Sequence, residues 1–409
     1  MSQHKHNPAK AIQDIQFFGE FGGVNPSISD SATYTFLKAK TMLDTFEGNA
    51  DGCYLYSRHT SPSNHYLSTA LAKMENTESA NVAGSGMGAI TPVILQLAHA
   101  GDHIVSSRTI YGGTYAFLKN WTPKFNIETS FVDITDLEKV EAAIQPNTKM
   151  IYAETLSNPL LELADVEGLA KIAKKHGVKL VIDNTFTPLI FTPANMGADV
   201  VIHSLTKFIN GTNDTVGGVI CSTNEFINEL KNVNDGSSML LGPVMDSLRS
   251  AQVLKNLRTL PIRMMQHSKN AAYLAEKLEQ DGVKVKYPGL QSHPQHDLFT
   301  KMMHPEFGYG GMMTLDLKTG DMATEFMERL QEKNVGYLAV SLGFYKTLFN
   351  APGKGTSSEV PEEEQAAMGL SEGLIRMSIG LDFDIADTYR KMKETLIEIG
   401  YFKNNLQTH

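Results

Sequence analysis

The fold is decided by two short apolar runs, Val178-Lys179-Leu180-Val181-Ile182 and Ala198-Asp199-Val200-Val201-Ile202. The first run ends at Asp183 and the second at His203-Ser204. Runs of this length that are apolar at most positions are typical of strands in a parallel sheet, because helices cover both faces of such a sheet. The two runs therefore predict an α/β protein built on a mostly parallel sheet.

The chain before these runs alternates helix and strand patterns in the same way. A capping-box pattern predicts a helix with Thr135 as its N-cap, and the run Met150-Ile151-Tyr152-Ala153 predicts a strand that ends at Glu154. A second helix is predicted between Asp165, a suitable N-cap, and Gly177, which ends it. Such alternation indicates βαβ units.

Composition and charge exclude several classes of protein. The chain has 409 residues, of which 42% are apolar and 20% charged, enough for two or three globular domains. The net charge is -9 and no basic stripe occurs, so no nucleic-acid partner is expected. No signal peptide and no run of the ~18 apolar residues that a membrane helix needs is found. With only two cysteines, Cys53 and Cys221, we expect a cytoplasmic enzyme without a membrane partner.

Ligands of open α/β sheets bind beyond the carboxyl ends of the strands, so the polar residues after these strands are the candidates for a site. Lys207 follows the second run, where burial lowers the pKa of an amine and leaves it able to attack a carbonyl. Ser204 and Thr206 flank it with hydroxyls that suit a phosphate. A solvated surface lysine is the alternative.

Three further residues have a possible chemical role and a plain structural alternative. Asp183 is either a turn aspartate or the carboxylate that keeps a pyridine nitrogen protonated, which makes the ring an electron sink. Tyr111 either stacks on such a ring or belongs to the core. Arg376 alternates with Ile375 and Met377 on a predicted strand, where its planar fork favours a carboxylate or a phosphate; a surface strand would also explain it.

A glycine-rich segment, Gly84-Ser85-Gly86-Met87-Gly88-Ala89, leads into an apolar run, and backbone N–H groups at such a helix start bind anions. The same residues match G-x-G-x-x-A, with Asp102 near the place of a dinucleotide-binding acid. A nicotinamide-dependent dehydrogenase is therefore one alternative, and a non-enzymatic binding protein is another. Both alternatives leave Lys207 and Asp183 without a role. No H-E-x-x-H metal motif and no G-x-S-x-G elbow occurs, so no metal is expected.

The segment from Ser204 to Phe208, continued through Gly211 and Asp214 to Gly217-Gly218, closely resembles the lysine signature of the Cys/Met-metabolism family. These are transsulfuration enzymes that depend on pyridoxal 5'-phosphate (PLP). Further family motifs follow in the right order over nearly the whole chain: Val24-Asn25-Pro26, Tyr56-Ser57-Arg58, Ser85-Gly86-Met87-Gly88, Tyr111-Gly112-Gly113-Thr114, Ser157-Asn158-Pro159, Asp183-Asn184-Thr185, Ser341-Leu342-Gly343 and Leu374-Ile375-Arg376.

The resemblance implies a role for each matching residue. Lys207 would carry the cofactor and, once freed, remove the Cα proton of the substrate. Asp183 would pair with the ring nitrogen, while Tyr111 would stack on the ring and protonate the leaving group. The phosphate would be held by Gly86, Met87, Ser204 and Thr206, and from a neighbouring subunit by Tyr56 and Arg58. The substrate carboxylate would be bound by Asn158, Ser341 and Arg376.

The resemblance also implies PLP fold type I, which is aspartate-aminotransferase-like. This fold has a mostly parallel sheet with helices on both faces and a smaller α+β C-terminal domain. The implied division is an N-terminal arm over residues 1–60 that contacts a neighbouring subunit, a PLP-binding large domain over 61–258 and a C-terminal domain over 259–409. The implied assembly is a homotetramer built from dimers with shared active sites.

Among the activities of the family, the run from Ser85 to Ile90 looks most like that of methionine γ-lyases. This implies a C–S lyase that converts methionine to methanethiol, 2-oxobutanoate and ammonia by γ-elimination. Gly113, however, stands where those enzymes usually have a cysteine, and Thr212 and residues 344–364 also depart from the family pattern. The alternatives are a γ-replacement enzyme (O-acetylhomoserine sulfhydrylase or cystathionine γ-synthase) and a cystathionine lyase.

Overall fold

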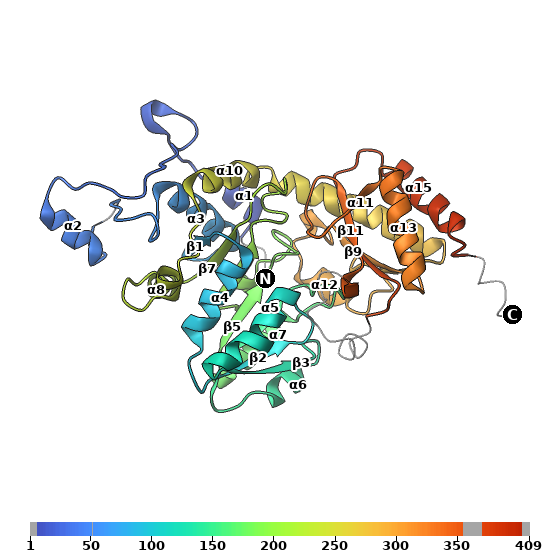
Figure 1. Ribbon diagram of the computed structural model, residues 1–409, viewed down its shortest axis with the longest axis horizontal. Helices are drawn as coiled ribbons and strands as arrows, with labels where there is room; N and C mark the ends of the chain where they lie inside the picture. Colours follow the sequence, from blue (N-terminus) through green and yellow to red (C-terminus); the bar gives the residue numbers. More distant parts are fainter. Residues whose placement is uncertain (1–5, 51, 355–369, 403–409) are drawn as a thin grey trace.

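The computed structural model describes residues 6–50, 52–354 and 370–402, which form two β-sheets with helices around them (Figure 1). The larger sheet has the strand order β1-β7-β6-β5-β4-β2-β3. Its strands are β1 Ser79–Ala83, β2 His103–Ser107, β3 Glu128–Val132, β4 Thr148–Glu154, β5 Lys179–Asp183, β6 Val200–Ser204 and β7 Gly218–Ser222. β2 to β6 pair in parallel, whereas β7 is antiparallel to both β1 and β6. The predicted α/β fold with a mostly parallel sheet is confirmed.

Alternate residues of the central strands lie in two separate cores, one on each face of this sheet. Leu180 and Ile182 of β5 join a core with helices α3 (Pro62–Glu75) and α7 (Val166–His176). Val181, between them, joins the other core with helix α4 (Gly86–Leu97). Burial on both faces explains why the strand is apolar at successive positions.

The helix ends show where local capping rules hold and where they fail. Helix α7 is capped as predicted, because the Asp165 side chain accepts from the Gly168 N–H at 3.0 Å. Helix α6 (Leu137–Ala142) has Asp136 as its N-cap, so the capping box based on Thr135 is wrong. The Thr135 hydroxyl donates instead to Asp133 at 2.7 Å, which removes it from the helix terminus.

The second sheet has the strand order β10-β11-β12-β9-β8. Its strands are β8 Lys284–Lys286, β9 Met312–Asp316, β10 Gly336–Leu338, β11 Thr347–Asn350 and β12 Leu374–Ser378. Helices α11 (Leu260–Gln280), α13 (Gly320–Glu332) and α15 (Ile385–Glu398) cover one face of it (Figure 1). The long helix α11 joins both halves, because Met264 packs in the core of the larger sheet and Leu274 in that of the second. The domain limits at 60 and 258 stay predictions.

Beyond its first helix, the N-terminal segment projects away from the sheets (Figure 1). Helix α1 (Pro8–Gln13) packs on α3 through Ile12, whereas α2 (Ala39–Phe46) buries none of its residues. The apolar side chains of Phe21 and Leu37 are fully exposed. A segment that exposes large apolar side chains differs from an ordinary solvated surface and is suited to contact with another chain.

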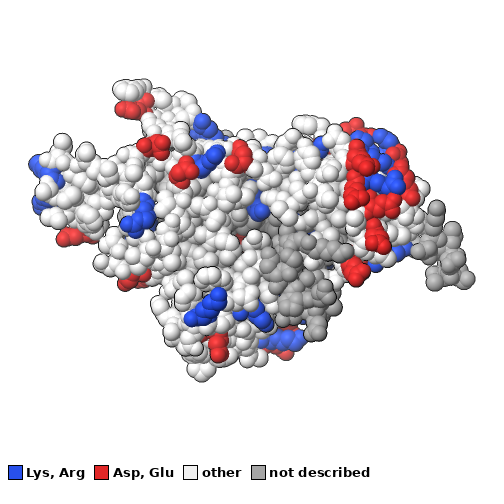
Figure 2. Space-filling view, viewed as in Figure 1, with Lys and Arg blue, Asp and Glu red and all other residues white. Residues whose placement is uncertain are grey.

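The remaining helices are short, and charge is unevenly distributed over the surface. They are α5 (Gly112–Ala116), α8 (Asn224–Leu230), α9 (Ser237–Leu241), α10 (Ser247–Leu257) and α12 (His296–Met302). Figure 2 shows charged side chains of both signs gathered over α13 and α15, where Arg329 and Arg390 form ion pairs with nearby carboxylates. No helix among the described residues is long and apolar enough to cross a membrane.

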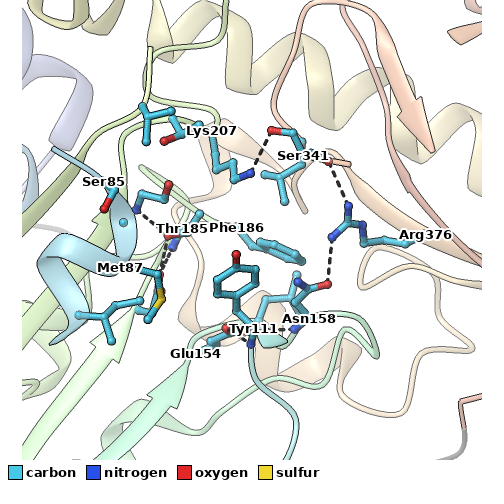
Figure 3. Close-up of a pocket in the computed structure, with 18 residues that line it drawn as sticks. Ser85, Met87, Tyr111, Glu154, Asn158, Thr185, Phe186, Lys207, Ser341 and Arg376 are labelled. Carbon is cyan, nitrogen blue, oxygen red and sulfur yellow. Dashed lines mark hydrogen bonds between the residues drawn. The ribbon is translucent and has the colours of Figure 1, made fainter. Parts of the chain in front are cut away.

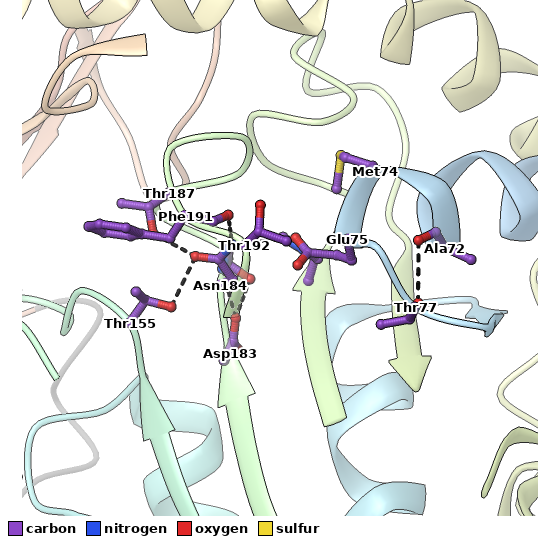
Figure 4. Close-up of polar contacts among 12 residues, drawn as sticks. Ala72, Met74, Glu75, Thr77, Thr155, Asp183, Asn184, Thr187, Phe191 and Thr192 are labelled. Carbon is purple, nitrogen blue, oxygen red and sulfur yellow. Dashed lines mark hydrogen bonds and ion pairs between the residues drawn. The ribbon is translucent and has the colours of Figure 1, made fainter. Parts of the chain in front are cut away.

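A buried polar network lies behind the carboxyl ends of β5 and β6 (Figure 4). The Asn184 Oδ1, just after β5, accepts from the hydroxyls of Thr155 and Thr187 at 2.9 and 2.6 Å. At the end of α3, the Glu75 Oε1 lies 2.7 Å from the His203 Nε2, and both side chains are fully buried. The network therefore ties helix α3 to the strand ends that lead into the predicted site.

Replacing Glu75 with alanine should destabilise the fold by about 3 kcal/mol, because the buried His203 ring would lose its partner. We expect a lower guanidinium midpoint, followed by circular dichroism. As a control, Lys73→Ala at an exposed position of the same helix should change stability by less than about 0.5 kcal/mol. Equal midpoints for the two variants would contradict this role of Glu75.

Candidate active site

A cavity lies beyond the carboxyl ends of β4, β5 and β6, between the two sheets (Figure 3). It encloses about 910 Å³ of empty space, including its opening to solvent. The structure brings together all the predicted site residues there except Tyr56 and Arg58. Those that line the cavity are Gly86, Met87, Tyr111, Asn158, Asp183, Ser204, Thr206, Lys207, Ser341 and Arg376.

Lys207 lies in the turn after β6 and extends its amine into the cavity. Its Nζ donates to the Ser341 Oγ at 2.9 Å, and that hydroxyl donates in turn to the Asn213 Oδ1 at 3.0 Å. Burial, and then the positive charge of Arg376, lower the pKa of Lys207 to about 8. An appreciable fraction of the amine is therefore neutral near physiological pH and able to act as a nucleophile or a base.

Asp183 ends β5 at the bottom of the same cavity. Its Oδ1 accepts from the Thr185 N–H at 3.0 Å and from the Thr185 hydroxyl at 2.5 Å. Burial raises the pKa of Asp183 above its ordinary value. A protonated nitrogen placed against this carboxylate would offset the cost of burying its charge.

The start of helix α4 forms a cradle for an anion. The Ser85 Oγ caps the helix by accepting from the Gly88 N–H at 2.8 Å. A Cβ on Gly86 would lie 3.0 Å from both the Cβ and the Oγ of Ser204, so glycine allows the helix start to approach β6 closely. Backbone N–H groups at a helix N-terminus, together with the hydroxyls of Ser204 and Thr206, suit a phosphate.

Arg376 reaches the cavity from β12 of the second sheet. Its Nη1 donates to the Asn158 Oδ1 at 3.1 Å and its Nη2 to the Ser341 carbonyl at 3.0 Å. Burial lowers the pKa of Arg376 to about 10, so the guanidinium stays charged at neutral pH. Ser341 has a φ of 99°, a conformation that costs energy for a residue with a Cβ and is typical of functional sites.

Glu154 also lines the cavity, and the sequence had indicated it only as a strand end. Burial, and then the negative charge of Asp183, raise the pKa of Glu154 above its ordinary value, whereas the N–H groups of Tyr111 and Asn158 stabilise its charged form. Its position at the carboxyl end of β4, directly opposite Asp183 on β5, was the available sign of a site residue. Thr185 and Phe186 were missed as well; both follow Asp183 in the turn after β5.

Tyr56 and Arg58 lie outside this cavity. Arg58 donates to the Met239 carbonyl at 3.0 Å, and its guanidinium lies 5.8 Å from the centre of the Tyr56 ring. Their predicted contact with the phosphate of a neighbouring subunit stays a prediction. Thr212 is also outside the cavity, where its hydroxyl donates to Asp214 at 2.7 Å. Of the divergent segment 344–364, residues 355–364 lie outside the described residues.

Comparison with known proteins identifies the family. The model of the family described as Cys/Met metabolism PLP-dependent enzyme matches residues 10–396. The chain belongs to this family. It is 43% identical to a methionine gamma-lyase of Arabidopsis thaliana over 91% of this chain and 86% of that protein. It is 35% identical to an O-succinylhomoserine sulfhydrylase of Pseudomonas aeruginosa over 92% of this chain and 91% of that protein.

The solved structure of a Campylobacter jejuni protein superposes on this chain with a TM-score of 0.88, and the two sequences are 30% identical. The superposition covers 96% of this chain and 100% of the Campylobacter jejuni chain. That structure carries N'-pyridoxyl-lysine-5'-monophosphate. The fold is thus PLP fold type I, and the chain is a PLP-dependent enzyme of the transsulfuration family. This finding excludes the nicotinamide alternative. Asp102 accordingly serves a turn, where it accepts from the His99 N–H at 2.8 Å.

The residues of the cavity fit this cofactor. An amine with a lowered pKa, a buried carboxylate and a helix N-terminus with two hydroxyls match its aldehyde, ring nitrogen and phosphate. The ring of Tyr111 projects into the same space, with its hydroxyl toward Lys207 (Figure 3). When bound, PLP supplies a protonated ring that withdraws electrons from the carbons of an amino acid.

The lowered pKa of Lys207 can be tested on the apoenzyme. The rate at which it attaches PLP should rise with pH and level off above about pH 8, because only the neutral amine attacks a carbonyl. Attachment would be measured by borohydride trapping followed by peptide mapping. Lys207→Arg should trap nothing at this peptide. A midpoint near 10.5, the ordinary value for lysine, would show that burial does not tune the amine.

Gly113 determines where the Tyr111 ring lies. A Cβ at position 113 would be 2.6 Å from the Tyr111 Cε1, so Gly113→Ala should displace the ring. If the ring stacks on the cofactor, we expect PLP to bind roughly tenfold more weakly, measured by titration of the apoenzyme. The control background is Tyr111→Ala, in which Gly113→Ala should weaken PLP binding little further. Equal effects in both backgrounds would mean that Gly113 acts elsewhere.

Proposed function

We propose that this enzyme is a C–S lyase that converts methionine and water to methanethiol, 2-oxobutanoate and ammonia by γ-elimination. The identity of 43% to a methionine gamma-lyase supports this activity. That identity is the observation that carries the proposal, and the cavity beyond its polar groups agrees with it. That part is lined by apolar side chains: Ile90, Leu156, Phe186, Val216 and Leu342.

An apolar lining suits the methylthio end of methionine. Cystathionine ends in a second amino and carboxylate group, which would need charged partners of their own. In the described lining the charged side chains are Glu154, Asp183, Lys207 and Arg376. In this proposal Asp183, Lys207 and Arg376 bind the cofactor or the common amino-acid part, and Glu154 is occupied by the N–H groups of Tyr111 and Asn158. The lining therefore favours methionine over cystathionine as the substrate.

In this proposal the side chains bind, orient and move protons. Arg376 and Asn158 bind the substrate carboxylate, which leaves the Cα–H bond within reach of the Lys207 Nζ. The Lys207 amine accepts the Cα proton, and the Ser341 hydroxyl, 2.9 Å away, orients it. The same amine, once it has passed the first proton on, accepts a second proton from Cβ. The bond from Cγ to sulfur then breaks, and the Tyr111 hydroxyl protonates the departing thiolate. Water then completes the release of ammonia.

The second candidate is γ-replacement on an acylated homoserine, which Gly113 and the 35% identity to a sulfhydrylase favour. An acyl ester also suits an apolar lining, so the cavity does not separate the two substrates.

The activity can be tested with two substrate mixtures. Methionine alone should give 2-oxobutanoate and methanethiol in equal amounts, and Lys207→Ala should abolish both. O-acetylhomoserine with sulfide is the second mixture. If homocysteine forms readily from it while methionine yields no 2-oxobutanoate, the enzyme is a sulfhydrylase and the lyase proposal is wrong.

We also propose a cytoplasmic homotetramer built from dimers with shared active sites. The exposed apolar residues of the N-terminal arm support an interface, since a single chain leaves Phe21 98% exposed. Tyr56 and Arg58 belong to this arm and lie outside the cavity of their own chain. In a dimer they would complete the phosphate site of the partner subunit.

A further inference from the structure

Glu154 has an unusual position in the site. It ends β4 directly beside Asp183, so two carboxylates lie on neighbouring strands, and each is at least 93% buried. Burying a second negative charge beside the first is costly unless each charge has partners. The hydrogen bonds that Glu154 accepts offset the cost of burying its charge.

The two oxygens of Glu154 accept from two different loops. Oε1 accepts from the Tyr111 N–H at 2.7 Å, and Oε2 accepts from the Asn158 N–H at 2.9 Å (Figure 3). Tyr111 is the N-cap of α5, after β2, whereas Asn158 lies in the loop after β4. One carboxylate therefore sets the spacing between the loop of the ring-stacking tyrosine and the loop of the carboxylate-binding asparagine.

The connection continues to the second sheet. The Asn158 Oδ1 accepts from the Arg376 Nη1 at 3.1 Å, so Tyr111, Glu154, Asn158 and Arg376 form one chain of hydrogen bonds. A carboxylate is the side chain that this position requires, since it presents two acceptor oxygens and no donor. Glutamine has one oxygen, and its NH2 group would face one of the two N–H donors.

We propose that Glu154 is a positioning residue that holds Asn158, and through it Arg376, in register with Tyr111. The proposal rests on the proposed function for the roles of these three residues. Its consequence is that Glu154 determines how tightly the carboxylate of an amino acid is bound, although Glu154 need not touch the substrate.

The test measures binding without turnover. L-Norleucine has the length of methionine but no sulfur to eliminate, and its binding to the holoenzyme would be followed by the visible absorbance of the cofactor. Glu154→Gln should weaken it about tenfold, because one N–H loses its acceptor. The matched control is Glu162→Gln, outside this cavity. Glu162 accepts from the Thr109 hydroxyl at 2.8 Å, and glutamine keeps that acceptor, so binding should change less than about twofold.

A double-mutant cycle tests the route of the effect. In an Asn158→Ala background, where the amide is already lost, Glu154→Gln should weaken norleucine binding by less than about threefold. If the fold-changes in norleucine affinity caused by Asn158→Ala and by Glu154→Gln multiply, Glu154 acts independently of Asn158 and the proposal is overturned. A Glu154→Gln enzyme that melts at a lower temperature but binds norleucine normally would also overturn it, because Glu154 would then be structural only.

The experiment also distinguishes a failure of the variant to fold and a failure of the lyase proposal from a failure of this inference. If Glu154→Gln does not fold, Glu154→Asp keeps the charge and both oxygens but is one methylene shorter. It should weaken norleucine binding more than about twofold, again only when Asn158 is present. If methionine yields no 2-oxobutanoate, the lyase proposal fails, while the ratio of norleucine affinities still decides the role of Glu154.

Discussion

The site depends on three parallel strands that end side by side. Because β4, β5 and β6 run in the same direction, their carboxyl ends meet at one edge of the sheet. That edge places Glu154, Asp183 and Ser204 next to one another, and the turn after β6 returns Lys207 over them. The covered faces of the sheet exclude water from these ends, and this burial shifts the pKa values of the lysine and both carboxylates.

Residues of the second sheet and its loops complete the lining of the cavity. Ser341 accepts from the Lys207 amine, and Arg376 donates to Asn158, so hydrogen bonds join the two halves within the cavity. Helix α11 packs in both cores and holds the halves in a fixed relation. Lys207 and Arg376 are thus held by different sheets, and their separation depends on how α11 packs.

Local patterns predicted much of this arrangement. The strand ending at Asp183, the helix between Asp165 and Gly177, and Lys207 all follow from periodicity, capping and the rule that ligands lie beyond strand ends. The choice between chemical and structural roles needed the family resemblance. Ser341 came from the resemblance alone, because a serine in an irregular loop has no periodic sign.

The errors and omissions have physical causes too. Thr135 is not the cap of α6 because Asp133, two residues earlier, captures its hydroxyl. Glu154 was passed over because a carboxylate at a strand end resembles any solvated residue until the groups that donate to it are known. Those donors are the N–H groups of Tyr111, which is distant in sequence, and of Asn158, which lies in an irregular loop, and both meet the carboxylate only in the fold.

The distribution of charge in the cavity bears on specificity. Two basic side chains, Lys207 and Arg376, and two carboxylates, Glu154 and Asp183, line the cavity. In the proposed function they bind, or position the groups that bind, the parts that every amino-acid substrate and the cofactor share. The part of a substrate that differs between methionine and an acylated homoserine meets apolar side chains instead. Apolar contacts separate similar ligands by only about 10–200-fold per methylene. Small changes of shape in this lining can therefore shift the preference between elimination and replacement substrates while the polar groups stay the same, and the chain is similar to a lyase and to a sulfhydrylase.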